Sequence, residues 1–222
     1  MSKTIITNTR TDLKIVVVGN SGTGKTSFCS RWSKDTFSDT YKATIMSEFS
    51  YKIYNYKGNN YKIQIWDIAG QDKNIYTSKI FTKDSHGALI VCDVTNPSTM
   101  EATTKWKKSI DENAKFIDGE KLPCVLIETK IDLVDLNEDD NEENTKAFAK
   151  QNGYINYFRT SAKNGIGVQE SMDYLIRKNI DRLEDYSVRT NVPIDKDRGS
   201  IVIQAPKKDT TSLLSKKQCC VV

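Results

Sequence analysis

The stretch from Leu13 to Phe28 constrains the fold of this chain more than any other part of it. An apolar run, LKIVVV, leads directly into GNSGTGKT, which has the spacing GxxxxGK[ST]. Glycines let the backbone turn so that successive N–H groups face one anion, and the positive end of a helix dipole follows. The pattern therefore predicts a strand, a phosphate-binding loop and the start of a helix. The predicted phosphate-binding residues are Gly19, Asn20, Ser21, Gly22, Thr23, Gly24, Lys25 and Thr26.

Two side chains of this loop have specific predicted roles. The Lys25 ammonium is expected to reach the outer phosphates, and the Thr26 hydroxyl is expected to hold Mg²⁺. A chance match in a loop rich in Gly and Ser is the alternative. The position of the motif between an apolar strand and a helix argues against it.

Strand-like and helix-like patterns alternate along the rest of the chain. They predict strands over residues 13–18, 47–57, 61–67, 87–93, 123–129 and 154–160, and helices over 25–34, 98–113, 141–152 and 167–185. The turn Gly58-Asn59-Asn60 joins the second and third strands as a hairpin. We therefore expect an α/β fold, the doubly wound sheet of P-loop NTPases. It should have six strands, mostly parallel with one antiparallel edge strand, flanked by about five helices.

Polar motifs follow four of these strands. Sheets of parallel strands bind ligands at the C-terminal ends of the strands. The phosphate loop, Asp67, Thr129-Lys130 and Ser161-Ala162-Lys163 are therefore expected to meet at one edge of the sheet. This convergence predicts a single nucleotide site.

Residues around the third strand suit a nucleotide hydrolase. Asp67 supplies a carboxylate near Mg²⁺, and the backbone N–H of Gly70 can bond a γ-phosphate. The Gln71 side chain can both donate and accept, so it can orient an attacking water. Thr44, in the loop before the hairpin, can add a second hydroxyl to the metal.

Residues after the last two strands suit a guanine base. The Asp132 carboxylate can accept the paired N–H donors of guanine, which adenine lacks. A backbone N–H near Ser161-Ala162-Lys163 can donate to the guanine carbonyl oxygen. The two motifs together predict guanine rather than adenine recognition.

Composition limits the class of protein. The 222 residues are 37% hydrophobic and 28% charged, which fits an ordinary globular domain with some extra polar chain. The net charge of +4 gives no argument for nucleic acid as a partner. Because no apolar run reaches the length of a membrane span and the first ten residues lack a signal-peptide core, we expect a cytosolic chain. The expected domains are a lead-in at residues 1–12, a nucleotide-binding domain at 13–185 and a disordered tail at 186–222.

Several other features have structural interpretations. Cys29, Cys92 and Cys124 are expected to be reduced core thiols. His86 has no acidic or hydroxyl pattern around it and is expected to be structural. The acidic run Asp135–Glu143 is expected to be a solvated loop rather than a metal site. The apolar stripe of the last helix is expected to face the core rather than a partner helix.

The motifs GNSGTGKT, YKATI, WDIAGQ, TKID and SAK, in this order, resemble those of the small GTPases of the Ras superfamily. The segments DTFSDTYKATI and KIQIWDIAGQD, with the double-cysteine terminus, are most similar to the Rab branch. The resemblance covers residues 10–185 and the terminus. It implies a GTP/GDP switch whose hydrolysis is slow without an external activating protein, because residues 35–46 contain no arginine to serve as an internal finger.

The resemblance also implies a role for each motif. Gln71, Lys25 and Thr44 would be catalytic, and Thr44 and Gly70 would sense the γ-phosphate. Mg²⁺ would be held by Thr26 and Thr44, and through water by Asp67. Besides the phosphate loop, the GTP- or GDP-binding set would be Phe37 (against the guanine ring), Thr44, Asp67, Gly70, Thr129, Lys130, Asp132, Ser161, Ala162 and Lys163.

Three positions depart from the family pattern. Thr129 stands where the family has Asn, and one hydroxyl replaces two donors and an acceptor. Nucleotide binding is therefore expected to be weaker by about 1–2 kcal/mol, with guanine specificity retained through Asp132. Met46 stands where a glycine is usual, and Gln71-Asp72-Lys73-Asn74 lacks the usual Arg-Phe pair. No particular effector can therefore be transferred from relatives.

The terminus KKQCCVV predicts a lipid anchor. It suits C-a-a-X prenylation at Cys219, or a Rab-type motif that uses both Cys219 and Cys220. The resemblance implies a monomer on the cytoplasmic face of membranes, with a cytosolic pool, that acts in vesicle trafficking. The partners that it implies are an exchange factor, a GTPase-activating protein, a GDP-dissociation inhibitor or escort protein, and effectors at residues 41–49 and 70–80. Nearby basic residues that could strengthen anchoring are Lys207, Lys208, Lys216 and Lys217.

Two other classes of protein are alternatives. A nucleotide-locked interaction module with negligible turnover is favoured by Thr129 and opposed by Gln71 and Thr44. A P-loop ATPase or kinase would share the sheet, but Asp132 and the SAK motif argue against it.

Overall fold

The computed structural model describes residues 11–70, 80–135, 141–191, 194–195 and 200–201. The strands are β1 (Thr11–Val18), β2 (Ser47–Tyr56), β3 (Asn59–Ile68), β4 (Gly87–Asp93), β5 (Cys124–Thr129), β6 (Asn156–Arg159), β7 (Ile194–Asp195) and β8 (Ser200–Ile201). The helices are α1 (Lys25–Lys34), α3 (Pro97–Asn113), α4 (Asn141–Gln151), α5 (Val168–Thr190) and the short 3₁₀ helix η1 (Ile131–Leu133). Residues 80–82 are also helical.

The main sheet has six strands in the order β2-β3-β1-β4-β5-β6. β2 runs antiparallel to β3, and the other pairs are parallel. Every residue of β4 and β5 is buried, as expected for central strands covered on both faces. The prediction of a doubly wound α/β sheet with one antiparallel edge strand is confirmed.

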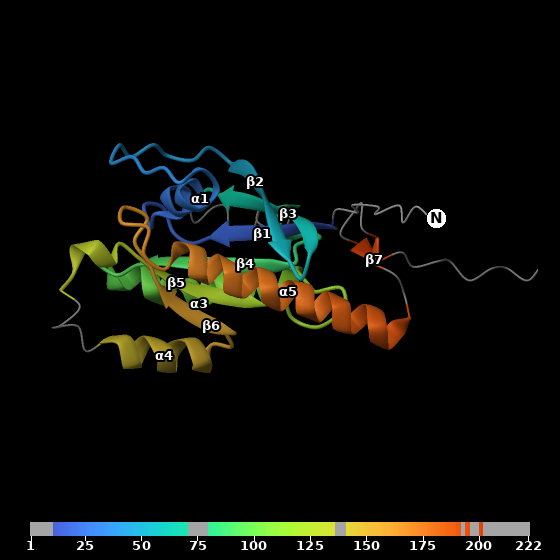
Figure 1. Ribbon diagram of the computed structural model, residues 1–222. Coiled ribbons are helices and arrows are strands. Elements are labelled where there is room, and N and C mark those ends of the chain that lie inside the picture. Colours follow the sequence, from blue (N-terminus) through green and yellow to red (C-terminus); the bar gives the residue numbers. More distant parts are fainter. Residues whose placement is uncertain (1–10, 71–79, 136–140, 192–193, 196–199, 202–222) are drawn as a thin grey trace, which may run out of the picture.

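Helices cover both faces of the sheet (Figure 1). The connection from β1 leads toward β3, whereas those from β4 and β5 lead the other way, so right-handed crossovers place their helices on opposite faces. α1 and α5 pack against each other on one face, and α3 and α4 lie on the other. Because β1, β3, β4, β5 and β6 run parallel to one another, the loops that follow them all lie at the same edge of the sheet.

The apolar stripe of α5 faces the core, as predicted. Its six side chains are each no more than 2% exposed: Val168, Met172, Leu175, Ile176, Ile180 and Leu183. The cysteine and histidine interpretations also agree with the structure. Cys29, Cys92 and Cys124 are free and buried, and the backbone N–H of Lys14 donates to His86 Nδ1.

The predicted turn of the β2–β3 hairpin is wrong by two residues. Asn59 and Asn60 belong to β3, where they pair with Tyr56 and Asn55. The turn is Lys57-Gly58, whose φ values of 51° and 76° are both left-handed. Two left-handed residues match the twist of the flanking strands, so the shorter turn is favoured.

The ends of two elements also differ from the prediction. β1 begins at Thr11 rather than at residue 13, and α5 continues to Thr190 rather than to residue 185. The helix ends where Asn191 adopts a φ of 53°, a conformation that Asn tolerates. β7 and β8 then form a separate antiparallel pair within the stretch expected to be disordered. The rest of that tail, including Cys219 and Cys220, lies outside the described residues.

None of the helices in the described part of the chain is both long and apolar enough to span a membrane. The described residues also contain no group of three His, Cys, Asp or Glu side chains that could hold a metal ion. Most of the acidic run, residues 136–140, lies outside them.

Candidate functional site

A hollow of about 610 Å³ lies at the edge where the parallel strands end. Residues of the phosphate loop, of Thr129-Lys130 and of Ser161-Ala162-Lys163 line it, together with Gly70 after β3 and the loop between α1 and β2. The predicted site residues in its lining are Ser21, Gly22, Gly24, Lys25, Thr26, Phe37, Thr44, Gly70, Thr129, Lys130, Asp132, Ala162 and Lys163. Asn20, Thr23, Asp67 and Ser161 are hydrogen-bonded to these lining residues. Gln71 lies outside the described residues.

Close backbone contacts fix the shape of the phosphate loop. A Cβ at Gly19 would lie 2.2 Å from the Val91 carbonyl oxygen of β4, and one at Gly70 would lie 2.4–2.5 Å from the backbone of residues 19–21. Only glycine allows such approaches, so the loop after β3 is pressed directly against the phosphate loop. α1 begins after Gly24 without a side-chain cap or an acidic first turn, so its N-terminal N–H groups suit an anion.

The Lys25 ammonium points back into the phosphate loop. Lys25 is 5% exposed, and its Nζ donates to the Asn20 carbonyl oxygen at 2.7 Å. Burial lowers the pKa of Lys25, and the nearby Asp67 carboxylate opposes this effect. A second contact reaches the loop from α3, where Trp106 Nε1 donates to Asn20 Oδ1 at 2.9 Å.

The three predicted Mg²⁺ ligands lie together beneath this loop. Thr26 Oγ1 donates to Asp67 Oδ2 at 2.5 Å and lies 2.8 Å from Thr44 Oγ1, which is 3.5 Å from the same Asp67 oxygen. The other carboxylate oxygen, Asp67 Oδ1, is buried and has no hydrogen-bond partner among the described residues. Burial raises the pKa of Asp67, against the lowering effects of Thr26 and Lys25. Hydroxyl and carboxylate oxygens with one unpaired acceptor fit a hard divalent cation.

Thr129 contacts the phosphate loop through the protein itself. Its side chain is buried, and its hydroxyl lies 2.6 Å from the Thr23 carbonyl oxygen and 2.9 Å from that of Cys92. The hydroxyl therefore joins β5 to the phosphate loop. That the substitution of Thr for Asn weakens nucleotide binding stays a prediction.

The two predicted base-binding loops are hydrogen-bonded to each other. Ser161 Oγ donates to Asp132 Oδ1 at 2.6 Å, and the Asn164 N–H donates to Ser161 Oγ at 3.1 Å. Lys130 Nζ lies 2.5 Å from Asp93 Oδ2 at the end of β4. Burial alone would raise the pKa of Asp93, but bonds from Lys130 and neighbouring Thr95 bring it below its usual value. Asp132 is thus held in place by a hydroxyl, and Lys130 by a carboxylate.

The loop between α1 and β2 closes over one side of the hollow. Tyr41 Oη lies 3.1 Å from Ser21 Oγ, and Phe37 lines the hollow nearby. Beyond Thr44, large apolar side chains are exposed, namely Ile45, Met46 and Phe49. Part of the predicted effector surface, residues 71–79, lies outside the described residues.

Sequence reasoning missed three residues that support this site. Asp93 pairs with Lys130, Trp106 bonds Asn20, and Arg31 bonds the backbone of the Ser161-Ala162-Lys163 loop. Arg31 and Trp106 lie on helices, outside the motifs that follow the strands. Asp93 ends β4, and the sequence pattern there predicts only an apolar strand. Its carboxylate at the same edge as the other motifs is the signal that could have indicated a role in the site.

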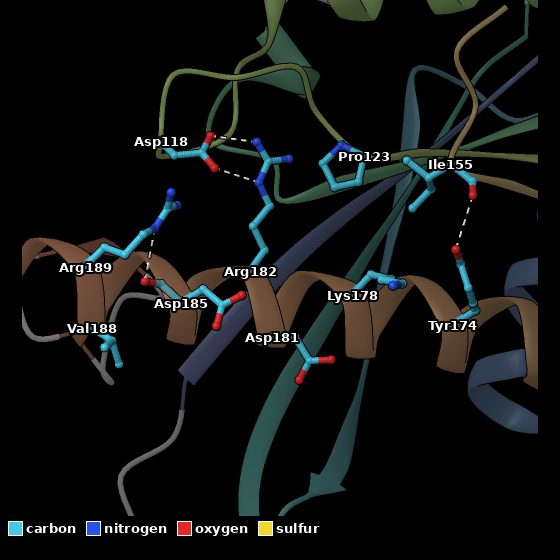
Figure 2. A pocket seen from close by; sticks show the side chains of 10 residues that line it. All are labelled: Asp118, Pro123, Ile155, Tyr174, Lys178, Asp181, Arg182, Asp185, Val188 and Arg189. Atoms are coloured by element: carbon cyan, nitrogen blue, oxygen red, sulfur yellow. Dashed lines mark hydrogen bonds and ion pairs between the residues drawn. The ribbon is translucent and has the colours of Figure 1, made fainter. Parts of the chain in front are cut away.

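A second hollow, of about 830 Å³, lies along the outer side of α5 (Figure 2). Arg182 spans it, with Nε and Nη2 donating to the two carboxylate oxygens of Asp118 at 2.6 and 2.7 Å. None of the predicted site residues lines this hollow. Its size therefore does not make it the nucleotide site.

The fold and the site define a P-loop protein whose loops suit a guanine nucleotide, and the comparisons agree. Residues 14–181 match the profile of the Ras family. The chain therefore belongs to the Ras family of small GTPases, which bind guanine nucleotide and hydrolyse GTP.

Its relatives place it more narrowly. It is 31% identical over 210 residues to Ras-related protein Rab-32 of Homo sapiens, covering 93% of this chain and 88% of the relative. It is 37% identical over 184 residues to Rab-32A of Dictyostelium discoideum, covering 82% of each chain. It is 33% identical over 166 residues to Rab-7L1 of Homo sapiens, covering 74% of this chain and 81% of the relative. The protein is a Rab small GTPase and a GTP hydrolase.

Proposed function

We propose that this chain is a membrane-attached switch that binds effectors in its GTP state and regulates intracellular vesicle trafficking. The observation that carries the proposal is the convergence of Thr26, Thr44 and Asp67. Thr44 belongs to the loop that precedes β2, so a ligand that holds Thr44 also orders a loop exposed to partners.

Mg²⁺ would be held by the hydroxyls of Thr26 and Thr44 and, through water, by Asp67. When bound, it neutralises charge on the β- and γ-phosphates. The buried Asp67 oxygen without a partner supports this assignment. The hydroxyl oxygens of Thr26 and Thr44 lie 2.8 Å apart, close enough for both to contact one cation.

Four groups of the chain would act on the phosphates and the attacking water. The N–H groups of the phosphate loop and the Lys25 ammonium donate to phosphate oxygens, and the Gly70 N–H donates to the γ-phosphate. The Gln71 side chain accepts a hydrogen bond from the attacking water and orients it. GTP and water then give GDP and phosphate, and Thr44 and Gly70 lose the group that held them.

Base recognition would come from the loops after β5 and β6. Asp132, oriented by Ser161, accepts the paired N–H donors of guanine, and a backbone N–H of the Ser161-Ala162-Lys163 loop donates to its oxygen. The Phe37 ring would lie against the base. Lys130 would lie beside it, held by Asp93.

Partner proteins would bind the exposed loops. Effectors, an exchange factor and a GDP-dissociation inhibitor or escort protein would contact residues 41–49 and 70–80, where Tyr41, Ile45 and Met46 are more than two-thirds exposed. Because residues 35–46 contain no arginine, an external activating protein would supply the charge that accelerates hydrolysis.

Membrane attachment would come from lipid on Cys219, Cys220 or both. One lipid chain anchors only marginally, and a second chain or the tail lysines would make anchoring stable. Mass spectrometry of the protein from its own cells tests this point. An unmodified C-terminal peptide would refute lipidation.

Nucleotide binding and single-turnover hydrolysis by the full chain test the switch. We expect tight binding of GTP and GDP with Mg²⁺, weak binding of ATP, and slow hydrolysis that an activating protein accelerates. The Gln71→Leu variant should bind GTP normally and hydrolyse it at least about tenfold more slowly. Gln169→Leu, an exposed glutamine of α5, is the matched control and should behave as the unaltered chain.

Two outcomes would replace the proposal. GTP binding without turnover, with or without an activating protein, would favour a nucleotide-locked interaction module. Equal binding of ATP and GTP would instead indicate a P-loop ATPase or kinase.

A further inference from the structure

Arg31 joins two segments that lead into the hollow of the proposed base site. It projects from α1, and its side chain is 19% exposed. Its Nε donates to the Ala162 carbonyl oxygen at 2.7 Å, and its Nη2 donates to that of Lys163 at 3.1 Å. The third nitrogen, Nη1, donates to the backbone oxygen of Asp35 at 3.1 Å and to its carboxylate at 2.8 Å.

The first arm of this contact fixes the loop between β6 and α5. Ser161 holds one end of the loop, because its N–H donates to the Ile166 oxygen and its hydroxyl to Asp132. Arg31 holds the next two carbonyls, and its Cδ would lie 4.0 Å from a Cβ built at Gly165. With these two carbonyls fixed, the peptide planes that join Ala162 to Lys163 and Lys163 to Asn164 are fixed, and so are the directions of the Lys163 and Asn164 N–H groups.

The second arm fixes the end of α1. Asp35 closes the helix with a φ of 54°, and its own N–H donates to the Arg31 oxygen at 3.0 Å. Phe37 follows two residues later and lines the nucleotide hollow. One guanidinium therefore links the start of the Phe37 loop to the loop that carries Ala162.

We propose that Arg31 is a positioning residue for guanine recognition. Through the Ala162 and Lys163 carbonyls it aims a backbone N–H of this loop at the oxygen on carbon 6 of the base. It does so without touching the nucleotide. This inference rests on the proposed function, because that function places guanine at this loop. Arg31 thereby sets both the lifetime of the bound nucleotide and the preference for a base that carries this oxygen.

The deciding variant is Arg31→Met, which keeps most of the buried stem and removes all the donors. Three diphosphates serve as probes in equilibrium binding to the full chain. GDP carries the oxygen and the 2-amino group, IDP lacks only the amino group, and 2-aminopurine riboside diphosphate lacks the oxygen. We expect Arg31→Met to weaken the binding of GDP and of IDP by the same factor, roughly ten- to a hundredfold. This is the size expected when hydrogen bonds to a charged group are lost. Binding of the 2-aminopurine nucleotide should change less than about twofold.

Two further variants separate the arms. Asp35→Ala removes only the carboxylate contact of Arg31 Nη1, whose side chain is 90% exposed, and leaves the contact with the Asp35 backbone oxygen. It should change GDP affinity less than about threefold. Arg31→Lys keeps the charge and a single donor nitrogen. Its selectivity for GDP over the 2-aminopurine nucleotide should lie between those of Arg31→Met and the unaltered chain. It also keeps the test decisive if the methionine variant does not fold. Arg177→Met, an exposed arginine of α5, is the matched control and should have no effect.

An equal loss of affinity for all three nucleotides would overturn the proposal, because Arg31 would then only support the fold of the site. No loss for any of them would overturn it as well. If the unaltered chain bound ADP as tightly as GDP, the proposed function itself would fail, and this result is visible before any variant is made.

Discussion

Met46 has a backbone conformation that its side chain disfavours. Its φ is 61°, and the Ala69 N–H donates to its carbonyl oxygen at 2.9 Å, which holds the chain there. A residue with a Cβ pays about 1–2 kcal/mol for this conformation, whereas glycine adopts it freely. The strain lies where the loop carrying Thr44 enters β2, directly beside the site.

We therefore expect Met46→Gly to raise the free energy of unfolding by about 0.5–1 kcal/mol, after the extra chain entropy of glycine is subtracted. Little packing is lost, because Met46 is 69% exposed. Urea unfolding of the nucleotide-free chain measures the change. Ile45→Gly is the matched control, since Ile45 is also exposed and its φ is not positive, and it should lower stability instead. A Met46→Gly variant with a lower free energy of unfolding would show that the Met46 backbone is not strained.

The Thr129 hydroxyl provides a second prediction at this scale. Thr129→Val keeps the shape and leaves the buried Thr23 carbonyl without the donor that lies 2.6 Å away. We expect GDP to dissociate about five- to thirtyfold faster, as for the loss of one hydrogen bond. Thr129→Ser retains the hydroxyl and should stay within about threefold. Stopped-flow release of a fluorescent GDP analogue measures both, and equal rates for Val and Ser would show that the hydroxyl does not hold the loop.

How far the sequence predicts the site depends on the kind of residue. Residues in contiguous motifs, such as Lys25 and Asp132, could be assigned from spacing alone. Arg31 and Trp106 could not, because their partners are loop atoms far along the chain, 131 and 86 residues away. Thr129 lines the hollow with the other motif residues, but its hydroxyl faces the Thr23 carbonyl oxygen, and sequence does not show which group a side chain faces.

At the scale of elements, sequence predicted the strands and helices well and their ends less well. α1 and β4 match the predicted bounds, because a glycine motif and a continuous apolar run define them. The β2–β3 turn was misplaced because any of its Gly and Asn residues suits a tight turn, and strand pairing selects among them. α5 runs five residues past the predicted end, where the sequence becomes too polar for a periodic signal.

The ion pair between Arg182 of α5 and Asp118 of the loop after α3 predicts that the free energy of unfolding depends on pH. Arg182 binds both oxygens of Asp118 (Figure 2). Its guanidinium carbon also lies 4.3 Å from the centre of the Phe116 ring. Burial would raise the pKa of Asp118, but the bonds and charge of Arg182, together with a bond from the Glu120 N–H, bring it below its usual value. A lowered carboxyl pKa in the folded state stabilises the fold above the unfolded pKa, near 3.9, and this contribution is lost as pH falls through the folded pKa.

Asp118→Asn should therefore lower the free energy of unfolding by about 2 kcal/mol at pH 7, since a bidentate charged pair is lost. The difference from the unaltered chain should shrink as pH falls below about 4. Urea unfolding at several pH values measures it. Asp173→Asn, whose Arg177 contact on α5 is 3.5 Å and more exposed, is the matched control and should cost less than about 1 kcal/mol. A difference that stayed constant with pH would contradict an ionised Asp118.

At the scale of the whole molecule, the site is built from loops that follow strands across the sheet. Thr26 follows β1, Asp67 ends β3, Asp132 follows β5 and Ala162 follows β6. A ligand that contacts all of them binds only when the sheet is formed, so its binding energy adds to the global stability. The nucleotide should therefore stabilise the chain as one unit.

We expect GDP with Mg²⁺, at about a hundred times its dissociation constant, to add about 2.7 kcal/mol and to raise the unfolding midpoint by about 5–10 °C. Differential scanning calorimetry of the full chain measures this shift, which should appear in one transition. EDTA should reduce the shift, because it removes the cation that Thr26, Thr44 and Asp67 would bind.

ADP should give a much smaller shift than GDP. Asp132→Ala should make the shifts from GDP and ADP equal, because it removes the acceptor for the guanine N–H donors. Equal shifts from GDP and ADP in the unaltered chain would mean that the loops after β5 and β6 do not distinguish guanine from adenine.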